Sequence, residues 1–386
     1  MGIRSLIARA AFALGCAAAL LALGSRNAFW GDYFVEAWPA YFHLRTDGVD
    51  AFLRLMPAYS GFVTLIGAPA AFLHLGLDWT FRVDAIPGLA ALAGLAVALH
   101  SRERSHALLA LVLTAGSPVA YLALDAGHPE DVLAAAAAVA GVLAAVRQKA
   151  TLSAALLTAA VLAKQTAVLA LLPAALALPK PKLRVLAAPV AAAVLVYGGV
   201  QLARPGGTSN LAAQVGAHAG SYFHPWQVWW PLGVPSDPAW AAAGHGTTTS
   251  PAWLVPIPHP LIVALALPLS ALWWWRAGHD RPREDALALF ALIALERCML
   301  DPWNLGYYHL PLVLALVAWE TEKRRPPVIA LATTVAIWLT FRTLELRTGM
   351  APMLMYLAWT LPLGAMLAGQ LFANPARARR LVPAFA

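Results

Sequence analysis

Long runs of apolar residues, separated by short charged segments, recur from the beginning of the chain to its end. A run of about 20 apolar residues crosses a bilayer once as a helix. Hydrophobic residues make up 60% of the 386-residue chain and charged residues 12%, against roughly 25% charged residues in soluble proteins. These values exclude a soluble enzyme, a disordered scaffold and a secreted disulfide domain. They predict an all-α, polytopic bundle of about 11–13 transmembrane helices.

Twelve of the runs are predicted to span the membrane. The first, residues 6–24, follows Arg4 and Arg9. It could be a signal peptide, but an uncleaved helix suits a chain that is apolar throughout. The two runs beside Lys164 are short and could be the halves of a broken pair. The runs after the first lie at residues 84–100, 107–124, 131–146, 151–163, 166–178, 185–203, 260–275, 286–300, 310–319, 328–342 and 352–372.

A further apolar run, residues 57–76, is interrupted by Pro57 and Pro69. If it lies along the outer interface instead of crossing, two thirds of the 27 Lys and Arg residues fall on one side, in agreement with the positive-inside rule. We therefore predict a multi-pass protein of the cell (plasma) membrane with both termini in the cytoplasm. The predicted cytoplasmic basic residues are Arg4, Arg9, Arg102, Arg104, Arg147, Lys149, Lys180, Lys182, Arg184, Arg276, Arg281, Arg283, Lys323, Arg324, Arg325, Arg377, Arg379 and Arg380.

The whole chain, residues 1–386, is expected to form one integral-membrane domain with two long outer loops, residues 25–83 and 204–259. Both loops are rich in Trp, Tyr, Phe, Pro and His, and the first is expected to contain interfacial helices. The net charge of +8 need not mean a nucleic-acid partner, because in a membrane protein Lys and Arg gather in the inner loops. We expect membrane lipids and no nucleic acid among the partners. The active site is therefore expected on the outer face.

Two acidic residues, Asp32 and Glu36, follow the first span among aromatic residues. A carboxylate at headgroup depth costs free energy unless it has a partner. Asp32 could be a general base or bind a sugar hydroxyl. It could equally cap the helix expected at residues 33–44, since Asp is a common N-cap. These residues alone leave both interpretations open.

A second acidic site, formed by His128, Glu130 and Asp131, lies between two predicted spans. Two carboxylates at the start of a helix stabilise its dipole, and that is the structural interpretation. The functional interpretation is an acidic site that faces Asp32 across one outer cavity. His128 could then bind substrate or transfer protons.

Two cations also need an explanation. Lys164 interrupts an apolar stretch, and an ammonium at that depth usually marks a partner or an anionic ligand. The alternative is a lysine whose amine reaches the headgroups. Arg297 could bind a phosphate or form an ion pair with Glu296 or Asp301.

Tyr307, Tyr308 and His309 begin a late span, where they could contact substrate or form an interfacial aromatic belt. The histidines of the second outer loop are irregularly spaced and show no metal-ligand pattern. We find no Gly-rich phosphate loop, nucleophile elbow or HExxH motif, and we identify no cofactor.

In their order along residues 1–320, these motifs resemble the GT-C superfamily of integral-membrane glycosyltransferases. The resemblance is to the family 87-like enzymes of actinobacteria, which use polyprenyl-phosphate sugars. The chain departs from the pattern because Asp32 is not part of an Asp-Asp or Asp-Glu pair, and no large soluble C-terminal domain follows. The motifs lie at residues 31–33, 38–41, 56–62, 127–131, 162–165 and 301–309.

The resemblance implies an inverting hexosyl- or pentosyltransferase. It would move mannose or a similar sugar from a polyprenyl-phosphate donor to a lipid or cell-envelope glycan. Asp32 would be the catalytic base, and Lys164 or Arg297 would hold the donor phosphate. The further expected site residues are Glu36, His128, Glu130, Asp131, Tyr307, Tyr308 and His309.

The main rival is a transporter or flippase of lipid-linked saccharides, which would need a polar path across the bilayer. A polysaccharide polymerase or ligase is a second rival, but the outer loop at residues 204–259 contains one Arg where such enzymes are rich in Arg and His. A structural membrane subunit is a third, and the charged residues described above argue against it.

Overall fold

The computed structural model describes residues 3–27, 31–57, 61–99, 104–179, 183–203, 223–238, 248–277, 282–343 and 349–372. Helices dominate these ranges, and the strands within them are one short antiparallel pair, in which Val234 pairs with Thr249. The strands are β1 (Val234–Pro235) and β2 (Thr248–Thr249). The predicted all-α fold is confirmed.

The helices of the first half begin with a long N-terminal helix and a group of short ones. In order they are α1 (Ile3–Gly24), the 3₁₀ helix η1 (Ser25–Asn27), α2 (Asp32–Glu36), α3 (Trp38–Thr46), α4 (Val49–Leu55), α5 (Gly61–Phe72), α6 (Leu77–Ala98), α7 (Arg104–Ala115), α8 (Pro118–Ala126), α9 (Pro129–Val146), α10 (Ala150–Ala163), the 3₁₀ helix η2 (Gln165–Ala170), α11 (Leu171–Ala177) and α12 (Leu183–Ala203).

The described ranges of the second half are also mainly helical. They are the 3₁₀ helix η3 (Trp230–Leu232), α15 (Pro258–Ala277), α16 (Asp285–Leu300), the 3₁₀ helix η4 (Gly306–His309), α17 (Leu310–Glu322), α18 (Val328–Trp338), the π-helix η5 (Leu339–Thr343) and α19 (Ala351–Phe372).

All twelve runs predicted to span the membrane are mostly helical, and two of them are interrupted. The chain leaves the helix at Ser117 between α7 and α8, and it widens into a π-helix after α18. It also leaves the helix at Lys164, between the predicted runs at residues 151–163 and 166–178. Within the described ranges, six helices are long and apolar enough to cross a membrane unaided. The predicted interfacial helix at residues 33–44 is instead two helices, α2 and α3, because the chain bends at Ala37.

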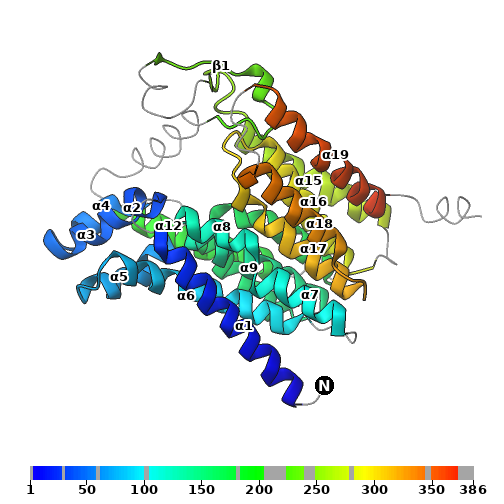
Figure 1. The fold of residues 1–386 in the computed structure, drawn as a ribbon, viewed down its shortest axis with the longest axis horizontal. Helices are drawn as coiled ribbons and strands as arrows, with labels where there is room; N and C mark the ends of the chain where they lie inside the picture. Colours follow the sequence, from blue (N-terminus) through cyan, green and yellow to red (C-terminus); the bar gives the residue numbers. More distant parts are fainter. Residues whose placement is uncertain are drawn as a thin grey trace, which may run out of the picture.

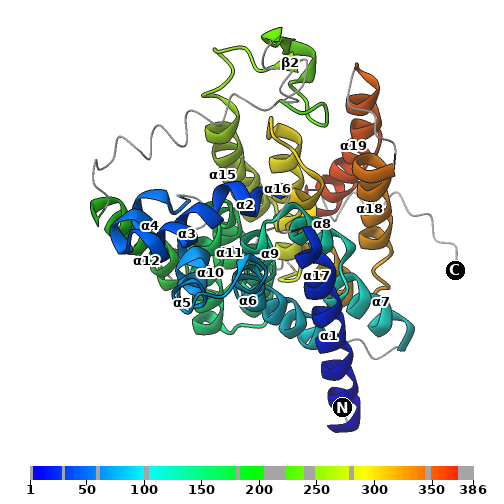
Figure 2. The ribbon, with the colours of Figure 1, turned by 60° about the vertical axis from the view of Figure 1, so that its left-hand side comes forward.

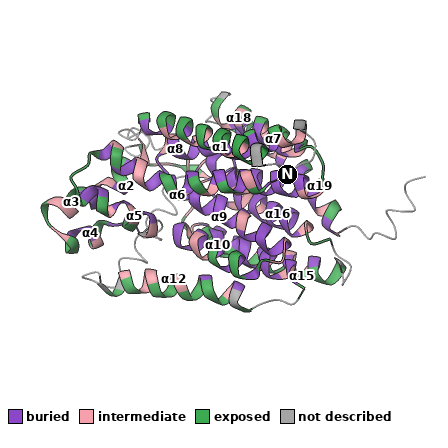
Figure 3. Ribbon diagram, turned by 90° about the horizontal axis from the view of Figure 1, so that it is seen from below, coloured by how far each residue is buried: buried purple, intermediate pink, exposed green. Residues whose placement is uncertain are grey.

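The core of the bundle is built from α9, α16 and α17, whose side chains are almost all buried. Figure 3 shows the buried residues of α9 and α16 in purple. Small residues allow this close packing, as is usual between membrane helices. A Cβ atom on Gly141 of α9 would lie 2.8 Å from Leu157 Cγ of α10, and one on Gly88 of α6 would lie 2.9 Å from the backbone nitrogen of Leu133. By contrast, α1 and α12 expose apolar side chains, which suits contact with lipid.

The described parts of the segments predicted as outer loops lie in different places, and α5, which belongs to the first segment, packs against α6 and α10. Helices α2 to α4 lie beside the C-terminal end of α1 (Figure 1), and the two strands lie at the end opposite to the N-terminus of α1 (Figure 2). Residues 204–222 and 239–247 of the second loop lie outside the described ranges. So do several of the predicted cytoplasmic basic residues, namely Arg102, Lys180, Lys182, Arg281, Arg377, Arg379 and Arg380.

Candidate functional site

Two glycines bring the first outer segment against the turn between α8 and α9. Gly127 ends α8 with a positive φ of 91°, and a Cβ atom there would lie 2.6 Å from the backbone nitrogen of Tyr33. A Cβ atom on Gly31 would lie 2.9 Å from the carbonyl oxygen of Ala126. Only glycine tolerates this conformation and this approach without strain. The contact places the start of α2 beside the start of α9.

His128 links two carboxylates across this contact. Its Nε2 atom lies 2.9 Å from Asp32 Oδ2, and its Nδ1 atom lies 2.8 Å from Glu130 Oε1. Burial opposes the charged form of His128, but the charge of Glu130 and the hydrogen bonds to Asp32 and Glu130 outweigh it and raise the pKa of His128 to about 10. The imidazolium therefore donates a hydrogen bond from each nitrogen, one to each carboxylate.

Asp32 does not act as the N-cap of α2. Gly31 occupies the N-cap position, and Asp32 is the first residue of the helix. The capping interpretation was therefore wrong. The Asp32 side chain is 51% exposed, whereas that of His128 is 8% exposed. A hydroxyl group outside the protein can therefore reach Asp32 while His128 holds it from within.

Lys164 neutralises the acidic pair that opens α9. Its Nζ atom donates a hydrogen bond to Asp131 Oδ2 at 2.7 Å and lies 3.4 Å from Glu130 Oε1. The side chains of Lys164, Asp131 and Glu130 are 12%, 11% and 6% exposed, respectively. The idea that Lys164 reaches the headgroups was wrong, because its ammonium is buried against carboxylates. Glu130 and Asp131 also lie in the first turn of α9, where they stabilise the helix dipole.

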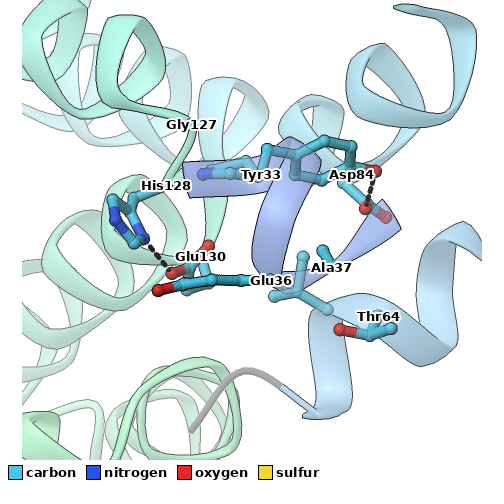
Figure 4. Close-up of a pocket in the computed structure, with 10 residues that line it drawn as sticks. Tyr33, Glu36, Ala37, Thr64, Asp84, Gly127, His128 and Glu130 are labelled. Atoms are coloured by element: carbon cyan, nitrogen blue, oxygen red, sulfur yellow. Dashed lines mark hydrogen bonds and ion pairs between the residues drawn. The ribbon is translucent and has the colours of Figure 1, made fainter. Parts of the chain in front are cut away.

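Glu36, on the last turn of α2, lines a small pocket together with Tyr33, His128 and Glu130 (Figure 4). Burial raises the pKa of Glu36 to about 7, although the positive charge of His128 lowers it. A carboxyl with this pKa is partly protonated near neutral pH. The empty volume of the pocket, including space open to solvent, is about 250 Å³.

Asp84 of α6 also lines this pocket, and sequence reasoning missed it. The carboxyl is 1% exposed, and its Oδ2 atom accepts hydrogen bonds from Tyr33 and Tyr41. The predicted span began at residue 84, so Asp84 passed as a boundary residue, whereas α6 begins at Leu77. An acidic residue inside an apolar helix was the signal that could have revealed it.

Arg297 of α16 lines a second pocket, which it shares with Asp131 and Tyr308. Its Nη2 atom lies 3.5 Å from Asp301 Oδ2, and its guanidinium lies 4.2 Å from the centre of the Tyr308 ring. The pairing with Asp301 is therefore present. Among the described residues, Arg297 Nε and both carboxylate oxygens of Glu296 have no hydrogen-bond partner. The walls of this pocket are otherwise mostly apolar and include Ala134, Ala135, Ala138, Thr166, Ala167, Leu169, Phe290, Ala294 and Pro311.

The aromatic residues of η4 are not an exposed interfacial belt. Tyr307 is buried and stacks on His128, with 5.0 Å between the ring centres, so it supports the acidic cluster. Tyr308 packs against Arg297, as described above. His309 is fully buried, and its Nε2 atom lies 2.9 Å from the hydroxyl of Tyr356. The structure thus brings Tyr307 and Tyr308 to the candidate site, while His309 packs toward α19.

One group of described residues has the geometry to hold a metal ion. Ligand atoms of His128, Glu130 and Asp131 lie within 4.8 Å of one another. Nitrogen and carboxylate ligands suit several divalent ions. A metal would have to displace the Lys164 ammonium and the ring proton on His128 Nδ1, which already supply positive charge to these carboxylates.

Comparison with known families supports an enzymatic role. Residues 61–180 match the family model of the alpha-(1->6)-mannopyranosyltransferase N-terminal domain. The matched segment contains His128, Glu130, Asp131 and Lys164, while Asp32 and Arg297 lie outside it. No curated protein and no solved structure matches the chain. The match and the apolar helices support a membrane glycosyltransferase, with a sugar donor and an acceptor as its substrates.

Proposed function

We propose that the chain transfers a hexose or pentose, with mannose first among them, from a polyprenyl-phosphate donor to a lipid or glycan acceptor at the outer membrane face. The observation that carries this proposal is the half-exposed Asp32 carboxylate, which is fixed by the buried His128, a residue of the segment that matches mannosyltransferases. The sequence resemblance to family 87-like enzymes supports the lipid-linked donor.

In the proposed reaction, Asp32 acts as the general base. The acceptor hydroxyl oxygen attacks the anomeric carbon of the donor, and its proton passes to Asp32. The bond between the anomeric carbon and the phosphate oxygen breaks, and its electron pair leaves with the polyprenyl phosphate. Attack from the side opposite to the phosphate inverts the configuration. His128 donates to Asp32 and keeps its carboxylate oriented toward the acceptor.

Of the two cations expected at the donor phosphate, Arg297 is the stronger candidate. A guanidinium suits a phosphate because it offers several donors in one plane, and the Nε–H of Arg297 has no partner among the described residues. Lys164 already bonds to two carboxylates, which a phosphate would have to displace. In the proposed complex, the mostly apolar walls of the pocket beside Arg297 would contact the first isoprene units of the donor.

The test is transfer by the purified protein in lipid, with radiolabelled polyprenyl-phosphate mannose, glucose and arabinose as donors. We expect Asp32→Asn to lower transfer by about 10²–10⁴-fold, which is the usual contribution of a positioned base. Donor binding should be retained. The matched control is Asp50→Asn, an exposed acid in the same outer segment, which should leave transfer unchanged.

Two results would contradict the proposal. Asp32→Asn with more than a tenth of the activity would remove Asp32 as the base. Movement of the donor between the two leaflets without any transfer would favour a flippase instead.

A further inference from the structure

The position of α2 depends on tertiary contacts. The helix contains five residues, and a helix of this length is unstable by itself in water. The glycine contact described above fixes its N-terminal end. A second attachment comes from Tyr33, which directly follows Asp32 in the chain and is buried in the interior of the bundle.

The second attachment is the hydrogen bond between Tyr33 and Asp84 (Figure 4). The Tyr33 hydroxyl donates to Asp84 Oδ2 at 2.7 Å, and the Tyr41 hydroxyl of α3 donates to the same oxygen at 2.6 Å. The Tyr33 ring also packs edge-on against Phe81 of α6, with 5.0 Å between the ring centres. One carboxyl on α6 thus holds α2 and α3, two of the helices of the first outer segment.

The neighbouring helix α5 leaves room for this carboxyl. A Cβ atom on Gly67 would lie 2.2 Å from Asp84 Oδ1 and 2.5 Å from the Tyr41 hydroxyl oxygen. Asp84 Oδ1 has no hydrogen-bond partner among the described residues. Burying an incompletely paired carboxyl costs free energy, so stability alone is a poor reason for an acid at this position.

We propose that Asp84 is a positioning residue for the reaction, and that it acts through Tyr33 on Asp32. The proposal rests on the proposed function. Loss of the Asp84 contact would let α2 shift or rotate. A shift of about 1 Å at a reacting group can lower the rate about 10²-fold. The effect should fall on kcat, because the donor phosphate is proposed to bind at Arg297 on another helix.

The experiment compares Asp84→Ala, Asp84→Asn and Tyr33→Phe in the lipid transfer assay. We expect Asp84→Ala to lower kcat about 10–100-fold with little change in donor KM. Asp84→Asn keeps an acceptor oxygen for both tyrosines and should recover most of that loss. Tyr33→Phe should lower kcat about tenfold. Because it removes only one hydroxyl, it still tests the proposal if Asp84→Ala fails to fold. If Asp84→Asn lowers kcat as much as Asp84→Ala does, the positioning role is overturned.

The matched control is Tyr121→Phe, which removes a hydrogen bond of the same kind, from a tyrosine hydroxyl to Asp125 at 3.0 Å on α8. It should leave kcat unchanged. Asp84→Ala should also have no further effect on the residual activity of Asp32→Asn, because residues that act through one group are not additive. An undiminished effect in that background would show a general structural role and overturn the proposal.

The same variants distinguish a failure of the positioning role of Asp84 from a failure of the proposed function. Full activity of Asp32→Asn would overturn the base assignment, and the positioning role with it. Loss of activity in Asp32→Asn together with normal kcat in Asp84→Ala and Tyr33→Phe would overturn the positioning role alone.

Discussion

Lys164→Met keeps most of the length of the side chain and removes the ammonium that neutralises Glu130 and Asp131. Glu130 would keep its hydrogen bond with His128, at 2.8 Å. Asp131 would lose its 2.7 Å partner, and its nearest other cationic atom, His128 Nδ1, is 4.0 Å away. In the variant, the buried Asp131 carboxylate is therefore left without a close positive partner.

The magnitude follows from burial, since none of the three side chains in this ion pair is more than 12% exposed. Solvent screens such a pair weakly, and removing one partner of a buried pair costs about 3–5 kcal/mol. Unfolding of the protein in mixed micelles, followed by circular dichroism during a denaturant titration, measures this loss. Adding Asp131→Asn should recover a large part of it, because the two changes act on the same interaction.

The control is Lys149→Met, an exposed lysine at the other end of α10, which should change the unfolding free energy by less than about 0.5 kcal/mol. The reasoning fails if Lys164→Met is as stable as the parent protein. It also fails if that variant loses donor affinity alone, because Lys164 would then be a phosphate ligand and not a partner of the two acids.

Two further predictions concern pH and topology. The pKa of Glu36 is raised from 4.5 to about 7, so its neutral form stabilises the fold below pH 4.5, and this contribution of up to about 3 kcal/mol is lost as the pH rises through 7. Glu36→Gln should therefore remove the decrease in unfolding free energy between about pH 4.5 and 7. If the variant shows the same decrease as the parent protein, another group causes it. For topology, a membrane-impermeant maleimide added to intact cells should label Asp50→Cys and should not label Lys149→Cys. The reverse pattern would invert the proposed orientation.

Much of the helix bundle could be predicted from the sequence because apolar length and loop charge are local properties. The spans at residues 131–146 and 286–300, for example, match α9 and α16 within two residues. Helix ends were less certain, and the error at α6 hid Asp84. Its missing first turns, which begin at Leu77, contain polar and charged residues that lower the apparent hydrophobicity.

The residues of the candidate site were recognisable, but their partners were not. Lys164 and Asp131 are far apart in sequence, and their ion pair depends on how α9 packs against α10. The direction of His309 depends on the 3₁₀ turn of η4, which points its ring at Tyr356. Tertiary packing of this kind leaves no periodic pattern in one sequence, so a polar residue could be noticed without its role being known.

The ion pair between Lys164 and Asp131 also bears on how the chain enters the bilayer. Helices α9 and α10 are consecutive, and they carry these opposite charges at the same end of the hairpin. Inserted singly, each helix would bring an uncompensated charge to the translocon, and a charge without a partner is costly inside the membrane. Inserted as a hairpin, the two helices neutralise each other before the remaining helices arrive. Biogenesis should therefore treat residues 129–163 and the lysine that follows as one unit, and a chain truncated after α9 should insert less efficiently than one that also contains α10 and Lys164.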